Sequence, residues 1–120
     1  MSWRDPTTRR DISYLLLTIV PPGYTITYNA LAQLLGTSPR AVGAYMRANR
    51  DLIVVPCHRV VAKRRLGGFS KGINFKKKLL KIEGALDGKA RPRNVIDSPS
   101  EFWQVAEKHG RGIEVDLDDP

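Results

Sequence analysis

The chain's single cysteine, Cys57, lies between a proline and His58 in the segment VVPCHRVVAKRRLGGF. A thiol acts as a nucleophile in its thiolate form, and a neighbouring histidine can accept the thiol proton. The segment is also rich in Lys and Arg, whose positive charge stabilises a thiolate. A lone cysteine is, however, more often a small buried apolar side chain, and adjacency in sequence does not prove that two side chains meet. A reactive thiol and a structural thiol therefore both remain open at this point.

Composition limits the classes of protein to which the chain can belong. With 120 residues, 42% of them apolar, it is long enough for one folded domain with a modest core. One cysteine excludes an internal disulfide and any zinc site that needs two or four cysteines. The two histidines, His58 and His109, are far apart in sequence, so we expect no metal and no cofactor.

No segment has the features of a membrane span or of a signal peptide. The longest apolar run, at residues 14–20, is too short to cross a bilayer, and no small-residue cleavage site follows it. We therefore expect no membrane partner and a reducing, intracellular compartment.

Positive charge is concentrated in one part of the chain. The formal net charge is +8, and residues 59–81 hold nine Lys or Arg residues and no Asp or Glu. Such a run is often a solvated face, but it is also typical of a surface that binds phosphate groups. The acidic tail EVDLDD is either a disordered, solubilising end or a segment that folds back onto the basic body.

Two short helices joined by a tight turn form the clearest structural pattern. The segment YNALAQLL can be capped by Thr27 and closed by Gly36. The next helix is predicted for PRAVGAYMRAN, with Ser38 as its N-cap and Pro39 at its first position. The pair has the pattern of a helix-turn-helix, although such pairs often only build a core.

Further helices and a small β element flank this pair. A helix is predicted for RDISYLLLTI, with the apolar stripe Ile12, Leu15, Leu16 and Ile19. An amphipathic helix is predicted for INFKKKLLKIEG, with lysines outward and with an inward face of Ile73, Leu79, Leu80 and Ile82. A buried strand is predicted for LIVV, and a small β-hairpin, or wing, for VVAKRRLGGF.

The last part of the chain is predicted to contain a linker, a helix and a tail. Residues 85–97 hold Gly, Pro and Arg and are typical of a linker. Ser98 and Glu101 have the spacing of a capping box for a last helix over roughly residues 99–109. The elements together predict a mainly α fold: a three-helix winged helix-turn-helix-like domain with a small β-hairpin, followed by a C-terminal extension over residues 86–120.

Several segments, in the same order along the chain, resemble one known family. The active-site motif of the O6-alkylguanine-DNA alkyltransferases is similar to PCHRV at 56–60. The family's Pro-Gly, Thr-Tyr and helix segment is similar to IVPPGYTITYNALAQLLG, and its recognition helix with the following asparagine hinge is similar to RAVGAYMRAN. Its guanine loop and closing helix are similar to LGGFSKGINFKKKLLKIEG. The resemblance covers roughly residues 10–85, so residues 1–85 are predicted to form the DNA-binding and active-site domain.

The resemblance implies a stoichiometric reaction at the thiol. Cys57, as a thiolate, would attack the alkyl carbon on O6 of a guanine in DNA and keep the alkyl group, so that each molecule reacts once. His58 would deprotonate the thiol through a water, and Glu83 would orient His58. Asn49 would brace the turn that holds the thiol, and Tyr28 would donate a proton to guanine N3.

The resemblance also implies a partner, which is double-stranded DNA containing O6-alkylguanine, bound through its minor groove by a monomer. The damaged nucleotide must leave the base stack, and Arg40 would fill the gap. The small residues Ala41 and Gly43 suit a helix pressed against a DNA backbone. Further contacts to DNA are predicted for Thr27, Arg59 and Lys71. Such a protein is expected in the cytoplasm, associated with DNA, in a prokaryote, or in the nucleus in a eukaryote.

A pocket for the flipped base is implied by the same resemblance. The carbonyls of Cys57 and Val60 would accept from the exocyclic amine of guanine, and the backbone N–H of Ser70 would face O6. Phe69 stands where the family usually has a tyrosine, which keeps stacking but loses a hydroxyl. Lys71 stands where glycine is common, at the lip of the pocket, and Lys76 is also assigned to the pocket.

Other interpretations remain. Tyr28 could be a core aromatic, Glu83 a solvent-facing helix end, Arg40 an ordinary first-turn arginine and Asn49 a helix C-cap. The family usually carries an N-terminal domain, which is expected to be absent because the matched segments begin near residue 10. Alkyltransferase-like proteins share this compact build but bear another residue, often tryptophan, in place of the cysteine. The chain could therefore be a sensor that binds alkylated DNA with little or no transfer, or a winged-helix regulator with a structural cysteine.

Overall fold

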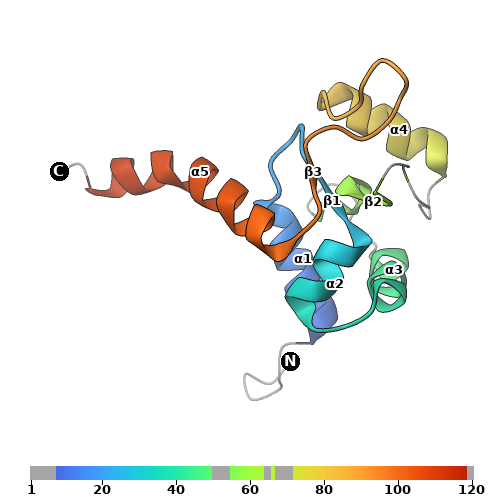
Figure 1. The fold of residues 1–120 in the computed structure, drawn as a ribbon, viewed down its shortest axis with the longest axis horizontal. Coiled ribbons are helices and arrows are strands. Elements are labelled where there is room, and N and C mark those ends of the chain that lie inside the picture. The colour runs from blue at the N-terminus through green and yellow to red at the C-terminus, as the bar shows by residue number, and fades with distance from the viewer. Residues whose placement is uncertain (1–7, 50–54, 64–65, 67–71, 119–120) are drawn as a thin grey trace.

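The structure, a computed structural model, describes residues 8–49, 55–63, 66 and 72–118, with side chains up to residue 109. Its elements are, in chain order, α1 (Arg9–Ile19), β1 (Thr25–Thr27), α2 (Tyr28–Leu35), α3 (Pro39–Ala48), the 3-10 turn η1 (Cys57–Arg59), β2 (Val60–Val61), α4 (Ile73–Ile82), β3 (Val95–Ile96) and α5 (Pro99–Asp118). Helices surround a small sheet, and α5 extends away from the body (Figure 1). This confirms the predicted fold class, which is mainly α with a small β element.

The first three helices begin at hydroxyl caps that the sequence places there. The side chains of Thr8, Thr27 and Ser38 each accept the backbone N–H of the third residue that follows, at 3.0–3.1 Å. Each cap satisfies one of the N–H groups that a helix leaves unpaired, worth about 1 kcal/mol. Gly36 ends α2 with φ at 68°, where a side chain would be strained. The α2–α3 pair therefore begins where the caps predict.

The sheet is short, parallel and almost fully buried. Strand β1 lies in the middle, with Ile26 opposite Val60 of β2 on one side and opposite Ile96 of β3 on the other. Strand β2 follows η1 directly, so its pairing with β1 fixes the position of the turn that carries the thiol. The described strand of the predicted hairpin thus pairs in parallel with β1, and most of residues 64–69 lie outside the described part of the chain.

The buried face of α1 is not the predicted stripe. Ile12, Leu15 and Ile19 are 37%, 63% and 41% exposed, whereas Ser13 and Leu17 are fully buried. The hydroxyl of Ser13 donates to the carbonyl of residue 10 at 2.6 Å, so its burial leaves no unpaired donor. Leu16, the fourth residue of the predicted stripe, is partly buried and packs against the core. The stripe was therefore wrong for Ile12, Leu15 and Ile19, because hydrophobicity alone does not say which flank of the helix meets α2 and α3.

The segment after residue 85 belongs to the sheet and the core, so the predicted linker over residues 85–97 was wrong. Ala85 and Ile96 are buried, and the Asn94 side chain donates to the carbonyl of Gly23 at 3.0 Å. Phe102 is 1% exposed and packs in the main core cluster. The division into residues 1–85 and 86–120 stays a prediction.

Helix α5 begins as predicted but is longer than predicted. Ser98 accepts the backbone N–H of Glu101 at 3.2 Å, and the helix continues to Asp118 rather than ending near residue 109. Figure 1 shows the helix pointing away from α4, and therefore away from the basic body. Among the described helices, none has both the length and the apolar character needed to cross a bilayer.

Candidate active site around Cys57

Cys57 opens the turn η1 and is 3% exposed. The chain reaches it through a tight bend, in which the Cys57 N–H donates to the carbonyl of Val55 at 2.8 Å. The Asn49 side chain donates to the same carbonyl at 3.1 Å and also bonds the thiol. Asn49 is at the same time the C-cap of α3. The end of α3 is thus tied to the turn that carries the thiol, and the position of Asn49 as a helix C-cap is confirmed. Its role in the reaction stays a prediction.

The side chains of His58, Arg59 and Glu83 form a hydrogen-bonded cluster, and His58 and Arg59 belong to the same turn η1 as Cys57. The His58 Nε2 lies 3.0 Å from Glu83 Oε2, and the Arg59 guanidinium donates to both Glu83 oxygens at 3.0 and 2.7 Å. A third Arg59 nitrogen donates to the carbonyl of Val20 at 2.7 Å. Glu83 caps the C-terminus of α4 and its side chain is 16% exposed, so it is not a solvent-facing helix end.

The cluster defines the protonation state of His58. Burial favours the neutral acid of Glu83, but the hydrogen bonds from Arg59 and His58 outweigh this and lower the pKa of Glu83. Glu83 is therefore a carboxylate, which only accepts, and the His58 Nε2 must carry the hydrogen. Burial lowers the pKa of His58 in spite of the carboxylate, so the ring is neutral near pH 7.

The other ring nitrogen of His58 is then free to act as a base. A neutral imidazole with hydrogen on Nε2 has a lone pair on Nδ1. Among the described residues, the His58 Nδ1 is buried and has no hydrogen-bond partner in the protein. A base that is oriented through its second nitrogen by a carboxylate is the arrangement that activates a nucleophile.

The thiol itself is held in its neutral form. Burial raises the pKa of Cys57, and this effect exceeds the opposite influences of the Asn49 hydrogen bond and the Lys76 charge. The positive charge of Lys76 thus favours the thiolate, as expected, but desolvation of the buried sulfur outweighs this effect in the free protein. A reaction at this thiol would therefore need a base, and His58 is the next residue in the sequence.

The burial of Lys76 shows that α4 is rotated relative to the predicted orientation. The predicted inward residues Ile73 and Ile82 are 45% and 77% exposed, whereas Leu80 and Lys76 are fully buried. The reason is that positions 76, 80 and 83 follow one another on the helix face that packs against η1. Lys76 thus lies inside, and its assignment to the pocket stays a prediction.

The Lys76 ammonium is hydrogen-bonded to one of the carbonyl groups that were assigned to the predicted pocket. Its Nζ donates to the carbonyl oxygen of Val60 at 2.6 Å and lies 5.9 Å from the ring centre of Tyr28. Burial lowers the pKa of Lys76 to about 8, and the charge of Cys57 opposes this. Burial also raises the pKa of Tyr28, which keeps its hydroxyl proton available. Cys57, Tyr28 and Lys76 therefore lie close enough for the charge of Cys57 to influence the pKa values of the other two.

Two residues assigned to DNA have other partners in this structure. Thr27 is 2% exposed, caps α2 and donates to Asp97 Oδ1 at 2.9 Å. Arg59 is 12% exposed and is engaged by Glu83 and Val20. Both side chains are hydrogen-bonded within the protein in this structure, and their contacts to DNA stay predictions. The sequence shows that Arg59 is near His58, but it does not show that both donate to one carboxylate.

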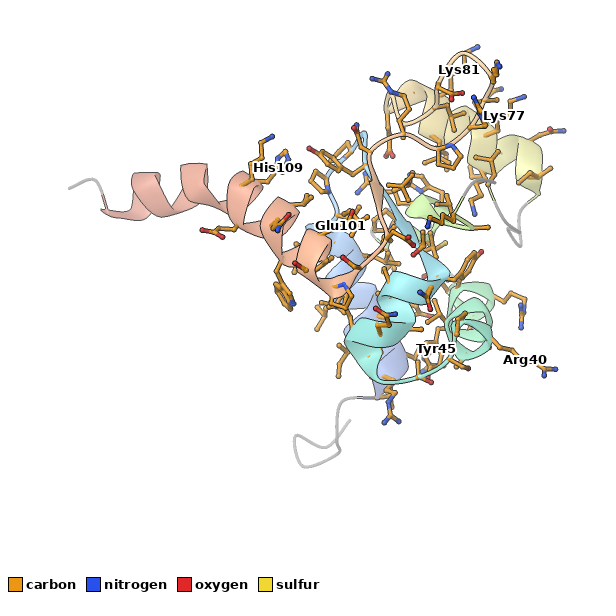
Figure 2. All side chains as sticks on the ribbon, viewed as in Figure 1. Arg40, Tyr45, Lys77, Lys81, Glu101 and His109 are labelled. Carbon is orange, nitrogen blue, oxygen red and sulfur yellow. The ribbon has the colours of Figure 1, made fainter. Side chains whose placement is uncertain are left out.

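Helix α3 presents the remaining predicted DNA contacts. Arg40 is exposed in the first turn of the helix and points away from the body (Figure 2). Ala41 and Gly43 are half-buried on either side of the outward face. Their contacts to DNA stay predictions. Three further predicted residues, Phe69, Ser70 and Lys71, lie outside the described residues.

The described residues hold no group of three or more His, Cys, Asp or Glu side chains that could bind a metal ion. The histidine and carboxylate of the site instead bond each other and Arg59. What this site can do chemically is to move a proton from a thiol.

Known proteins resemble the chain over the same region. A methylated-DNA--protein-cysteine methyltransferase of Metallosphaera sedula is 52% identical over 64 residues, which are 53% of this chain and 41% of that protein. The crystal structure of O6-methylguanine-DNA methyltransferase from Pyrococcus kodakaraensis matches with a TM-score of 0.60 and 54% identity, over 62% of this chain and 45% of that one. The chain thus spans about two fifths of the length of such curated relatives.

A third match differs in its extent. The structure of S. pombe Atl1 in complex with damaged DNA containing O6-carboxymethylguanine matches with a TM-score of 0.57 and 25% identity, over 70% of this chain and 84% of Atl1. The family model for the DNA-binding domain of 6-O-methylguanine DNA methyltransferase matches residues 9–85, which contain α1 to α4 and the thiol turn. The chain therefore belongs to the 6-O-methylguanine DNA methyltransferase family, through its DNA-binding domain.

Proposed function

We propose that the chain repairs DNA by transferring the alkyl group of O6-alkylguanine to its own Cys57. One observation carries the proposal: the buried Cys57 is followed in η1 by a buried histidine whose Nε2 is bonded to Glu83 and whose Nδ1 has no partner among the described residues. The relatives that are named methylated-DNA--protein-cysteine methyltransferases support this chemistry. A structural cysteine would need no such base.

The reaction is a single displacement. The His58 Nδ1 takes the thiol proton, directly or through a water, and the Cys57 sulfur attacks the alkyl carbon. The S–C bond forms as the C–O6 bond breaks, and the electrons of that bond pass to the guanine. Tyr28 gives a proton to the guanine anion, and the proton on His58 restores the phenol through solvent. The product thioether is inert, so each molecule reacts once.

The proposed substrate is a flipped nucleotide in a duplex. Arg40 on the exposed face of α3 would fill the gap in the base stack, and a net charge of +8 favours binding to phosphates. The carbonyl of Val60 would select guanine through its exocyclic amine, and its bond to Lys76 leaves its second lone pair for that contact. We propose that the protein acts as a monomer through the minor groove.

Mass spectrometry of the intact protein tests the proposal. The protein is mixed with an equimolar duplex that holds one O6-methylguanine, and a peptide digest locates the adduct. We expect the mass of one methyl group on Cys57 and unmodified guanine in the DNA. The Cys57→Ala variant should bind the duplex and leave the methyl group in place. Transfer by this variant would contradict the mechanism.

A damage sensor is the second candidate function. Two observations favour it: burial raises the pKa of the Cys57 thiol, and the match to Atl1 covers most of that protein. A sensor would bind the O6-methylguanine duplex more tightly than the unmodified duplex and show no change of mass. The same experiment therefore separates the two functions.

A further inference from the structure

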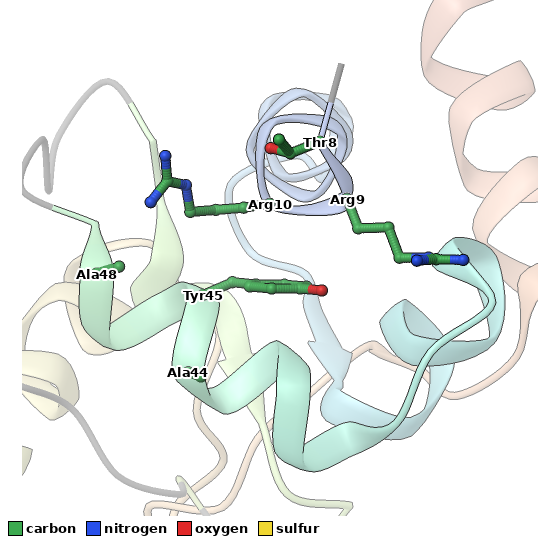
Figure 3. A pocket seen from close by; sticks show the side chains of 6 residues that line it. All are labelled: Thr8, Arg9, Arg10, Ala44, Tyr45 and Ala48. Carbon is green, nitrogen blue, oxygen red and sulfur yellow. The ribbon is translucent and has the colours of Figure 1, made fainter. Parts of the chain in front are cut away.

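An open groove of about 620 Å³ lies between the start of α1 and the side of α3 (Figure 3). Its lining residues come from these two helices and are Thr8, Arg9, Arg10, Ala44, Tyr45 and Ala48. No residue of the thiol site is among them. The groove is therefore a separate surface feature, which the proposed chemistry does not use.

The groove continues the outward face of α3. The exposed residues of that helix are Pro39, Arg40, Ala44, Arg47 and Ala48, and Ala44 and Ala48 also form one wall of the groove. Small side chains let another backbone come close to a helix. A polymer that lies along the exposed face of α3 would therefore also meet the groove.

The opposite wall of the groove is cationic. In Figure 3 the Arg10 side chain reaches over the α3 wall near Ala48, and Arg9 extends toward the loop after α2. The Arg9 Nε donates to the carbonyl of Leu35 at 3.0 Å, which holds its guanidinium in place. No Asp or Glu is among the six lining residues, although Asp11 follows in the same helical turn. The groove thus suits an anion that runs along α3.

We propose that this groove binds phosphate groups of the DNA strand that runs beside α3, with Arg10 as their main contact. The inference rests on the proposed function, because it requires that α3 lie against DNA. It adds a second row of phosphate contacts, on the α1 side of the helix. Tyr45 forms the floor of the groove, with its backbone carbonyl bonded by the Tyr14 hydroxyl at 2.7 Å, so the two helices keep a fixed spacing.

The salt dependence of DNA binding tests the contact. In a Cys57→Ala background, which cannot consume the lesion, dissociation constants for an O6-methylguanine duplex are measured over a range of salt concentrations. Removing one phosphate contact should lower the slope of log K against log salt by about 0.9. We expect this change of slope for Arg10→Gln. At 0.1 M salt, the variant should bind the duplex about eightfold more weakly than the parent protein does.

The matched control is Lys77→Gln, which removes the same charge from an exposed position on α4, far from the groove in Figure 2. Its slope should stay close to that of the parent protein. Equal losses for both variants would show a general charge effect and overturn the proposal. An unchanged slope for Arg10→Gln would overturn it as well.

Neutral methylphosphonate linkages then locate the phosphate. They are introduced one at a time on each strand around the lesion. When the neutral linkage replaces the phosphate that Arg10 contacts, at one position or two adjacent ones, Arg10→Gln should cause no further loss of DNA-binding affinity. The reason is that the partner of Arg10 is already neutral. If the loss of affinity from the neutral linkage and the loss from Arg10→Gln add at every position, the assignment is overturned. Methyl transfer by protein with an intact Cys57 is measured in parallel, so failure of the proposed function appears there and not in the slopes.

Discussion

At the scale of single residues, Glu83 controls the site by accepting from two neighbours at once. Its carboxylate holds the His58 Nε2 at 3.0 Å and the Arg59 guanidinium at 2.7 Å. The first contact selects the tautomer of His58, and the second keeps Glu83 ionised. In the proposed reaction, Glu83 is therefore a positioning residue that would act on Cys57 through His58.

Replacing the Glu83 carboxylate tests how the orientation and tautomer of His58 depend on the charge of Glu83. Glu83→Gln keeps a side chain of the same shape, but the amide NH₂ can face His58 and favour the wrong tautomer. We expect single-turnover methyl transfer to slow by about 100-fold or more. The acid limb of the pH profile should also move to lower pH, because the carboxylate no longer raises the pKa of His58. Glu101→Gln, at the exposed start of α5, is the control and should transfer at the normal rate.

Lys76 is the other residue with a measurable electrostatic role. Lys76→Met keeps much of the buried volume but removes the charge that favours the Cys57 thiolate. The pKa of the thiol should rise further, and reaction of Cys57 with a small alkylating reagent at fixed pH should slow about tenfold. Lys77→Met changes a neighbouring exposed lysine and should leave that rate unaltered. A normal rate in folded Lys76→Met protein would exclude the role.

At the scale of elements, β3 and α5 complete the core that α1 and α2 begin. Strand β3 pairs with β1, and Phe102 inserts from the first turns of α5 into the main cluster. The next residue, Trp103, is 55% exposed and meets the Phe102 ring edge to face at 4.9 Å. Two adjacent aromatic residues thus differ in burial, which makes them a matched pair.

Denaturant unfolding can compare this pair. Phe102→Ala should lower the free energy of unfolding by about 3–5 kcal/mol, because it leaves a large cavity in the core. Trp103→Ala should change it much less, by about 1 kcal/mol. Equal effects would mean that α5 does not pack on the core as described.

At the scale of the whole molecule, stability should fall in acid for a predictable reason. Hydrogen bonds from Arg59 and His58 lower the pKa of Glu83, and burial lowers that of His58. A lowered pKa means that the unfolded chain takes up protons first, so stability is lost as the pH falls. The loss begins near pH 6.5 with His58 and continues below pH 4.5 with Glu83. The net charge of +8 grows as carboxylates are protonated, which adds repulsion.

Unfolding free energies measured from pH 7.5 to pH 3.5 check this expectation. The wild-type protein should lose stability in two stages, and Glu83→Gln should lack most of the lower stage. The same titration at high salt should reduce the contribution of charge repulsion but keep the Glu83 stage, because buried pairs are screened less. A pH-independent stability over this range would refute the linkage.

The sequence alone determined the features that depend on near neighbours or on residue type. The caps at Thr27 and Ser38 use groups within a few residues, so they form wherever the helices form. The segment PCHRV placed a histidine next to the only cysteine, and its resemblance to a known active-site motif implied the roles of His58, Asn49 and Glu83 before any contact was known. The mainly α class followed from the same local patterns.

Only the tertiary structure decided which faces turned inward. A helix with apolar residues on several sides can pack in more than one rotation, and the choice depends on its neighbours. That choice exposes Leu15 on α1 and buries Lys76 on α4. Tertiary structure also pairs β3 with β1, and it pairs the Arg59 guanidinium with the Glu83 carboxylate. These contacts join residues far apart in the chain, and no local pattern records the long-range packing free energies that select them.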